Sequence, residues 1–292
     1  MTVEIPRTPP EAARDHLTPT ARAALGRSAE ERIHLIRSGS WIPYPRAQQI
    51  RERLRWVFDQ PPSQRMTGLT LSGPTNNGKT TIIRAFMAEM NGHVTAADAE
   101  RRDYLYIETP PFPSASMLFT AILTAAGDLK AQKGTMTQKM FRVQHILPQI
   151  GLRMLFLDEI HNVLAGSQKQ TEVFLNTLKS LSNHLRLPVV LIGTENAVHV
   201  LRTDAQVLNR FPTVELPYWP SDASFHQLVR AVLSTFPLQR PPRLTAAALQ
   251  RLHKVSGGAL GGVVQVLQRA AALAIKDGSE ELTPKFLEAA EV

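Results

Sequence analysis

Residues 73–80 have the spacing Gly-x-x-x-x-Gly-Lys-Thr, which is typical of a loop that binds the phosphates of a nucleoside triphosphate. Backbone N–H groups of such a loop converge on the phosphates, and the dipole of the following helix adds positive potential. We expect Lys79 to lie against the β- and γ-phosphates, Thr80 to offer its hydroxyl to Mg²⁺, and Gly78 to let the backbone approach closely. The candidate binding residues are Gly73, Pro74, Thr75, Asn76, Asn77, Gly78, Lys79, Thr80 and Thr81.

The residues on both sides of this loop support the interpretation. Leu69–Ser72 reads as a short apolar strand, and the residues after Thr81 read as an apolar helix. A strand that leads into the loop and a helix that follows it are the context that phosphate binding requires. A glycine-rich turn that carries a lysine by chance would not need either element.

Two adjacent acids form the second candidate group. Residues 153–157 are mostly apolar and are followed directly by Asp158 and Glu159. This pattern indicates a buried parallel strand with carboxylates at its carboxyl end, where ligands bind in open α/β sheets. We expect Asp158 to hold Mg²⁺, directly or through water, and Glu159 to orient and polarise the attacking water. Many strands end in an acid, so the prediction depends on the pairing with the phosphate loop.

Further polar residues follow the next apolar run, residues 188–193. Thr194 and Asn196 both remain candidates to reach the γ-phosphate or the attacking water, and we place Thr194 among the catalytic residues. His161 has two interpretations, as a group that communicates with a neighbouring subunit or as a histidine packed at the surface.

The elements that must position these groups alternate along the chain. Strand patterns occur at residues 69–72, 104–108, 153–157, 188–193 and 213–216, with helical patterns between them. From about residue 221 onward the patterns are helical only. We therefore predict an α/β fold with a parallel five-stranded sheet sandwiched by helices, plus a C-terminal helical lid. The expected division is a partly helical, partner-binding arm at 1–40, a nucleotide-binding domain at 41–219 and the lid at 220–292.

An aromatic and apolar segment, Trp41–Pro45, precedes the phosphate loop. Its position suits contact with an adenine ring, for which Ile42 and Tyr44 are the candidates. The alternative is a hydrophobic tether onto the core.

Composition and charge limit the classes of partner. The chain has 292 residues, a net charge of +8 and a pI of about 10.0. This surplus indicates either a polyanionic partner or a basic, solvated surface. Cysteine is absent, which excludes disulfides and thiolate metal sites. No apolar run has the length of a membrane span, so we expect no membrane partner and a cytoplasmic protein.

One basic segment is suited to a polyanion. The loop around residues 130–139 carries lysines and hydroxyls with no balancing acid, and we expect it to follow a DNA phosphate backbone. Its alternative is a solvated turn between helices. The candidate DNA contacts are Lys130, Lys133, Thr135, Lys139 and Arg142.

Together these features resemble an AAA+ ATPase over roughly residues 40–292, and within that class the chain is similar to the TniB family of transposition ATPases, which are related to TnsC. The resemblance is carried by Trp41–Ala47, Gly73–Thr80, Leu157–Asn162, Ile192–Thr194 and Ser256–Gly258 with Gly261.

The resemblance implies an ATP- and Mg²⁺-dependent oligomer, a ring or a helix, that binds double-stranded DNA without sequence preference. Such an assembly recruits a DDE-type transposase and an accessory targeting protein, and DNA-stimulated ATP hydrolysis drives its disassembly. In AAA+ rings the arginine before the last strand reaches the neighbouring subunit's γ-phosphate, a position that Arg210 matches here, with Arg202 the weaker candidate.

One position departs from the AAA+ pattern. Many members carry an arginine after a glycine turn in the lid, whereas this chain has no arginine between Gly261 and Arg269. We therefore expect slow hydrolysis, which suits a timed switch.

Two other functions compete with this reading. A helicase-loader or replication-initiation ATPase would have a similar fold, but initiators commonly append a helix-turn-helix after the lid, and the sequence stops at Val292. A small-molecule kinase is disfavoured because Glu159 beside Asp158 favours the activation of water.

Overall fold

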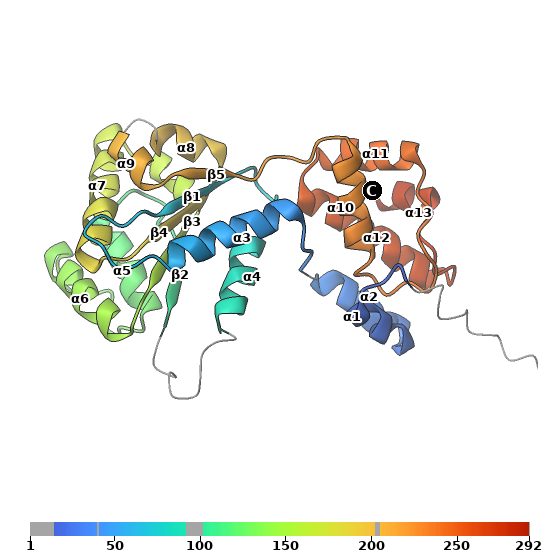
Figure 1. Cartoon of the computed structure of the whole chain (residues 1–292), viewed down its shortest axis with the longest axis horizontal. Helices are drawn as coiled ribbons and strands as arrows, with labels where there is room; N and C mark the ends of the chain where they lie inside the picture. Colours follow the sequence, from blue (N-terminus) through green and yellow to red (C-terminus); the bar gives the residue numbers. More distant parts are fainter. Residues whose placement is uncertain (1–14, 40, 92–101, 202–204, 292) are drawn as a thin grey trace, which may run out of the picture. The chain divides into compact units, whose positions relative to one another are not determined.

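The computed structural model describes residues 15–39, 41–91, 102–201 and 205–291. The chain forms two compact units (Figure 1). One is Pro45–Pro217, and the other combines the described residues of Met1–Tyr44 with those of Tyr218–Val292. The division near residue 218 lies close to the expected one, but the described part of the expected N-terminal arm groups with the C-terminal helices.

The first unit contains the parallel five-stranded sheet that the sequence predicts. The strands are β1 (Leu69–Ser72), β2 (Tyr104–Glu108), β3 (Met154–Asp158), β4 (Val189–Gly193) and β5 (Thr213–Glu215). Their order in the sheet is β2-β3-β4-β1-β5, and every neighbouring pair is parallel. Because β4 lies between β3 and β1, the two chemical motifs come from strands that are not hydrogen-bonded to each other.

Helices cover both faces of this sheet (Figure 1). On one face Phe156 of β3 packs edge-on against Phe86, which in turn packs against Phe58, with ring centroids 6.1 Å apart in each pair. On the other face Leu155 and Leu157 join a core with the next helices. The first face is covered by α3 (Pro45–Phe58) and α4 (Lys79–Asn91). The second is covered by α5 (Ala115–Ala125), α6 (Met136–Gln149), η4 (Ile160–Ala165), α7 (Gln168–Leu185), α8 (Glu195–Leu201) and α9 (Ala205–Arg210).

The starts of several helices follow from local side-chain caps. The side chains of Thr135 and Ser167 each accept a hydrogen bond from the backbone N–H three residues ahead. In both cases a glutamine at that position accepts a hydrogen bond from the backbone N–H of the cap residue. Such caps satisfy donors that the first helical turn leaves open and contribute about 1 kcal/mol each. The beginnings of α6 and α7 are therefore encoded locally.

The second unit is built from helices throughout its described residues. These are α1 (Pro19–Ala23), η2 (Ala24–Gly26), α2 (Ala29–Ser38), α10 (Ala223–Leu233), α11 (Ala246–Ser256), α12 (Leu260–Lys276) and α13 (Pro284–Ala290). Arg32 of α2 is 5% exposed and forms a bidentate ion pair with Glu280, at 2.6 and 2.7 Å. Its guanidinium also donates a hydrogen bond to the Pro237 carbonyl. Gln268 of α12 also donates to the Ile36 carbonyl, at 2.6 Å. These buried polar contacts explain why the N-terminal helices do not form a separate arm.

No helix in the part of the chain described by the structure has the length and hydropathy needed to cross a membrane.

The Arg32–Glu280 pair predicts a large asymmetry between two arginines of the helical unit. Arg32→Leu removes a guanidinium that is 6% exposed and leaves both Glu280 and the Pro237 carbonyl without their donor, so it should lower the free energy of unfolding by about 3–5 kcal/mol. Arg243→Leu removes an exposed partner of Glu281 and should cost about 0–1 kcal/mol. Urea unfolding in a Trp56→Phe background, which keeps Trp41 and Trp219 of this unit as the fluorescent reporters, measures both. Equal losses for the two variants would contradict this account.

Candidate nucleotide-binding site

The phosphate loop connects the buried strand β1 to the first residue of α4, Lys79. A Cβ atom at Gly73 would lie 2.4 Å from the Leu216 carbonyl oxygen, so the loop can pass the end of β5 only with glycine at this position. Asn77 is 1% exposed, and its amide donates to the carbonyls of Leu216 and Pro217, at 3.0 and 2.8 Å. The Asn77 side chain therefore anchors the loop to the chain after β5, while Thr75 and Asn76 are exposed.

The ammonium group of Lys79 is bound by backbone carbonyls of this loop. Its Nζ atom donates to the carbonyls of Gly73 and Pro74, at 2.8 and 2.7 Å. Burial lowers the pKa of Lys79, while Asp158 and Glu159 oppose that shift. A partly desolvated cation held over a glycine-rich loop fits the phosphates of a nucleotide.

Asp158 is the point at which three elements meet. Its Oδ2 atom accepts a hydrogen bond from the Thr80 hydroxyl, at 3.0 Å, and another from the Tyr106 hydroxyl. Asp158 is 5% exposed. A carboxylate and a hydroxyl at this spacing form the oxygen donor set that Mg²⁺ takes beside phosphates, so the residues fit the ion that the sequence implies.

Tyr106 is a site residue that the sequence reasoning did not identify. It lies on β2 opposite Phe156 in the parallel register, two positions before the Glu108–Asp158 pair. Burial and the bond to Asp158 raise the pKa of Tyr106, so the phenol stays protonated and keeps donating. Tyr104 and Tyr106 are two residues apart and so lie on the same face of a strand, but only the strand order places that face beside Asp158.

Glu159 follows Asp158 in the left-handed region, with φ 54° and ψ 39°. Its side chain is 47% exposed, and its Oε2 atom lies 2.9 Å from Nδ1 of His161. Thr194 and Asn196 follow the carboxyl end of β4, which neighbours β3. The Thr194 carbonyl accepts from Ala197 N–H, while Asn196 is exposed, so the two candidates remain open.

The candidate adenine contacts lie in the other compact unit. Tyr44 is 5% exposed and packs edge-on against Trp219, with ring centroids 5.2 Å apart. Burial raises the pKa of Tyr44 to about 12, and its hydroxyl makes no hydrogen bond to any described residue. Ile42 is also buried. Tyr44 is thus part of a packed core, as the tether alternative states, and its contact with adenine stays a prediction.

The structure does not present Arg210 for contact with a second subunit. Its side chain is buried, and Nη1 donates to the Lys179 carbonyl at 2.9 Å. Burial and the nearby Arg65 lower the pKa of Arg210. A guanidinium committed to its own chain would have to leave this contact before it could act on a neighbour. The weaker candidate, Arg202, lies outside the described residues.

The basic segment divides into exposed and internal residues. Lys130, Lys133 and Thr135 are exposed, and Thr135 also caps α6. Lys139 is 7% exposed, and its Nζ donates to the Thr120 hydroxyl at 2.8 Å. Its ammonium is therefore directed into the fold.

Residues 130–139 contain no acid, but Asp128, just before them, pairs with one of the candidate DNA contacts. The guanidinium of Arg142 lies 3.3 Å from the carboxylate of Asp128, and it donates to the Lys130 carbonyl at 2.9 Å. Arg142 therefore fixes the loop to α6, and its charge is largely compensated by Asp128.

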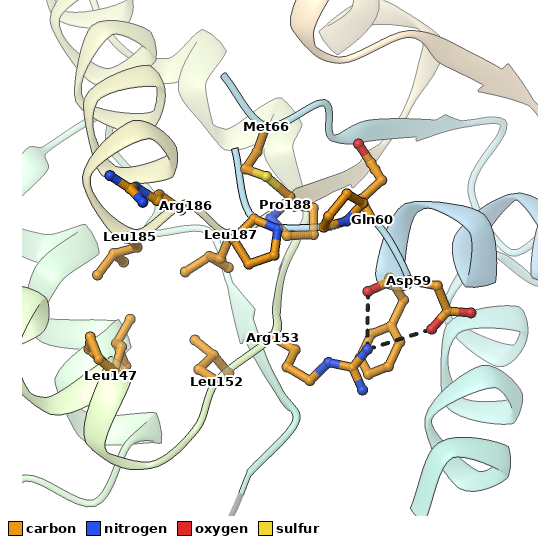
Figure 2. Close-up of a pocket in the computed structure, with 14 residues that line it drawn as sticks. Asp59, Gln60, Met66, Leu147, Leu152, Arg153, Leu185, Arg186, Leu187 and Pro188 are labelled. Carbon is orange, nitrogen blue, oxygen red and sulfur yellow. Dashed lines mark hydrogen bonds and ion pairs between the residues drawn. The ribbon is translucent and has the colours of Figure 1, made fainter. Parts of the chain in front are cut away.

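A cavity of about 510 Å³ lies at the opposite, amino edge of the sheet (Figure 2). It is lined by residues that precede β1, β3 and β4, including Met66, Leu152 and Pro188. On its wall the guanidinium of Arg153 stacks 3.9 Å from the Phe58 ring centroid and lies 3.5 Å from Asp59. The cavity contains neither the phosphate loop nor the acid pair, so it is separate from the candidate nucleotide site.

A phosphate loop and an Asp-Glu pair at the carboxyl edge of a parallel five-stranded sheet, in a chain that also has a helical unit, define a P-loop ATPase of the AAA+ class. The sequence matches the family described as bacterial TniB protein over residues 32–221, which is more than half of the chain. The protein therefore belongs to the TniB family of transposition-associated AAA+ ATPases.

Solved structures of AAA+ proteins share this fold. The Aeropyrum pernix ORC1 protein in complex with DNA superposes with a TM-score of 0.61 at 14% identity, covering 84% of this chain and 63% of that one. Cdc6p from Pyrobaculum aerophilum gives a TM-score of 0.62 at 16% identity, with coverages of 88% and 69%. The Aeropyrum pernix ORC2 protein in ADPNP–ADP complexes gives 0.60 at 16%, with coverages of 88% and 71%. A search of curated proteins found no match.

The contact between Tyr106 and Asp158 predicts a role in metal-dependent nucleotide binding. Tyr106→Phe removes a hydrogen-bond donor that orients the Asp158 carboxylate. It should therefore raise the Mg²⁺ concentration needed for half-maximal binding of an ATP analogue by roughly tenfold. Tyr104→Phe is the matched control, because its hydroxyl donates to the Met87 carbonyl instead. Titration of Mg²⁺ at fixed fluorescent analogue measures both. Equal shifts in the two variants would refute a specific role for Tyr106.

Proposed function

We propose that this protein is an ATP-dependent regulator of DNA transposition. It binds double-stranded DNA without sequence preference and oligomerises on the target DNA. The oligomer then recruits a DDE-type transposase together with an accessory targeting protein. The observation that carries the proposal is the convergence of Lys79, Thr80, Asp158 and Glu159 at one edge of the sheet in a chain of the TniB family.

The chemistry of the site follows from these residues. When bound, Mg²⁺ would neutralise phosphate charge, and Thr80 and Asp158 are the residues that would hold it. Lys79 exchanges its carbonyl partners for phosphate oxygens, to which a cation binds more strongly. Glu159 accepts the proton of the attacking water, which makes the reaction hydrolysis to ADP and phosphate. Hydrolysis then resets the assembly.

DNA binding is assigned to the exposed part of the basic segment. Lys130 and Lys133 are exposed. Lys139 is buried and Arg142 is bound to Asp128 and to the Lys130 carbonyl, so we assign both to the support of the loop. The net charge of +8 agrees with a polyanionic partner. The solved ORC1 protein is a complex with DNA, which supports DNA as the partner of a chain with this fold.

A helicase-loader or replication-initiation role is the second candidate, because the solved structures above that share the fold include ORC and Cdc6 proteins. The deciding measurement is the anisotropy of arbitrary duplex DNA with a slowly hydrolysed ATP analogue, with ADP and without nucleotide. Analogue-dependent and sequence-blind binding supports the transposition role. Absence of DNA binding under all three conditions would contradict both the transposition role and a DNA-binding initiator, and would leave a loader that acts on a protein partner.

Two substitutions at the nucleotide site test whether ATP binding and hydrolysis switch the protein between its DNA-bound and its free state. Lys79→Ala should abolish nucleotide binding, since it removes a charged partner of the phosphates. Glu159→Gln keeps the shape of the site but not its base, and should trap the ATP-bound oligomer on DNA. Anisotropy and light scattering report both states. A folded Glu159→Gln variant that has lost DNA binding would disprove the switch.

The division of the basic segment gives a further prediction. Lys130→Ala and Lys133→Ala should each weaken duplex binding and lower the slope of log K against log salt by about one. Lys139→Met should leave that slope unchanged, because its ammonium bonds within the fold. Salt titrations of the three variants test this, and a reduced slope for Lys139→Met alone would reverse the assignment.

A further inference from the structure

The side chain of His161 lies beside that of the candidate base, Glu159. Its Nδ1 atom is 2.9 Å from Oε2 of Glu159, and the two side chains are 37% and 47% exposed. The Nδ1 atom itself is buried and makes no aligned hydrogen bond within the described chain. Two lone pairs at this distance would repel each other, so the contact requires a proton on Nδ1.

The backbone that carries both residues is held by the strands on either side. Asn162 donates through its side chain to the Thr109 carbonyl, just after β2, at 2.9 Å. Ile160 is fully buried, and a Cβ atom at Gly193, the last residue of β4, would lie 2.7 Å from its Cγ2 atom. His161 therefore sits between two anchored neighbours and approaches Glu159 from a fixed position.

Glu159 itself is held in the left-handed backbone conformation, which non-glycine residues rarely adopt. Its N–H donates to Oδ1 of the preceding residue, Asp158, at 2.7 Å. The backbone is thus determined, but a half-exposed glutamate side chain still has several rotamers. One oxygen lies beside His161, and the other makes no hydrogen bond to any described residue, so it can accept a proton from water.

We propose that His161 is a positioning residue that donates from Nδ1 to Glu159 and holds the second carboxylate oxygen toward the attacking water. This role rests on the proposed ATP hydrolysis. Hydrogen bonds of this kind are often poorly aligned before substrate binds and tighten in the reacting complex, which agrees with the unaligned contact seen here. Misplacement of a base by about 1 Å can cost up to roughly 100-fold in rate.

Three substitutions separate positioning from packing. His161→Asn places an amide donor near the position of Nδ1, His161→Gln places it near Nε2, and His161→Phe provides no donor. We expect kcat to fall roughly tenfold in the Gln and Phe variants and to stay near wild type in Asn, with KM and analogue affinity unchanged in all three. An unchanged or increased kcat in His161→Phe, or an Asn variant no better than Phe, would overturn the role.

The contact can also be tested without nucleotide. Long-range ¹H–¹⁵N spectra of the nucleotide-free protein report the protonation of each ring nitrogen, and loss of one signal in His161→Asn identifies His161 among the nine histidines. We expect Nδ1 to carry a proton in the wild type and the Nε2–H tautomer to increase in Glu159→Ala. An unprotonated Nδ1 in the wild type would overturn the contact.

The two proposals fail in different ways. Absence of ATP hydrolysis in the wild type would overturn the proposed function and, with it, the role of His161. Wild-type hydrolysis with no kinetic difference among the three His161 variants would overturn the positioning role alone.

Discussion

One carboxylate oxygen, Oδ2 of Asp158, is the contact on which the rest of the site depends. It accepts hydrogen bonds from Thr80 at the start of α4 and from Tyr106 on β2. Because β4 lies between β1 and β3, this contact joins the two halves of the site across an intervening strand. A parallel sheet makes the arrangement possible, since the ends of all its strands meet at the same edge. The phosphate loop, the acid pair and the polar tip of β4 are brought together by that geometry.

A strained backbone conformation and several charged side chains lie close together at this carboxyl edge of the sheet. Glu159 adopts a left-handed conformation directly after the strand, and Lys79 is partly desolvated beside two carboxylates. Such features persist only when the surroundings determine them, and they concentrate at sites that bind or react. Here the determinants are close contacts at Gly73 and Gly193, where a larger residue would meet the neighbouring backbone or side chain. The glycines thus bear on the position of the chemistry as much as the acids do.

The basic residues of the chain serve two different purposes. Arg32, Lys139 and Arg210 are buried and bond to groups of their own chain, where they hold helices and loops in place. Lys130 and Lys133, by contrast, are exposed. A net charge counts both kinds equally, although only exposed charges attract a polyanion from solution. The DNA surface that we propose is therefore smaller than the list of basic residues suggests.

The sequence by itself determined the five strands, the phosphate loop and the acid pair, because apolar periodicity and the spacing of glycine, lysine and acids are local properties. The AAA+ fold was implied by the resemblance of these motifs to a known class of proteins. It did not determine which residues become partners across the chain. Tyr106 reaches Asp158 only through the order of the strands, Arg32 finds Glu280 at the other end of the sequence, and Asp128 compensates Arg142 through the fold of a loop. Burial of Arg210 likewise follows from packing against α7 and not from its neighbours in sequence. Strand order, burial and ion pairing depend on contacts between distant residues, and these exist only once the tertiary structure has formed.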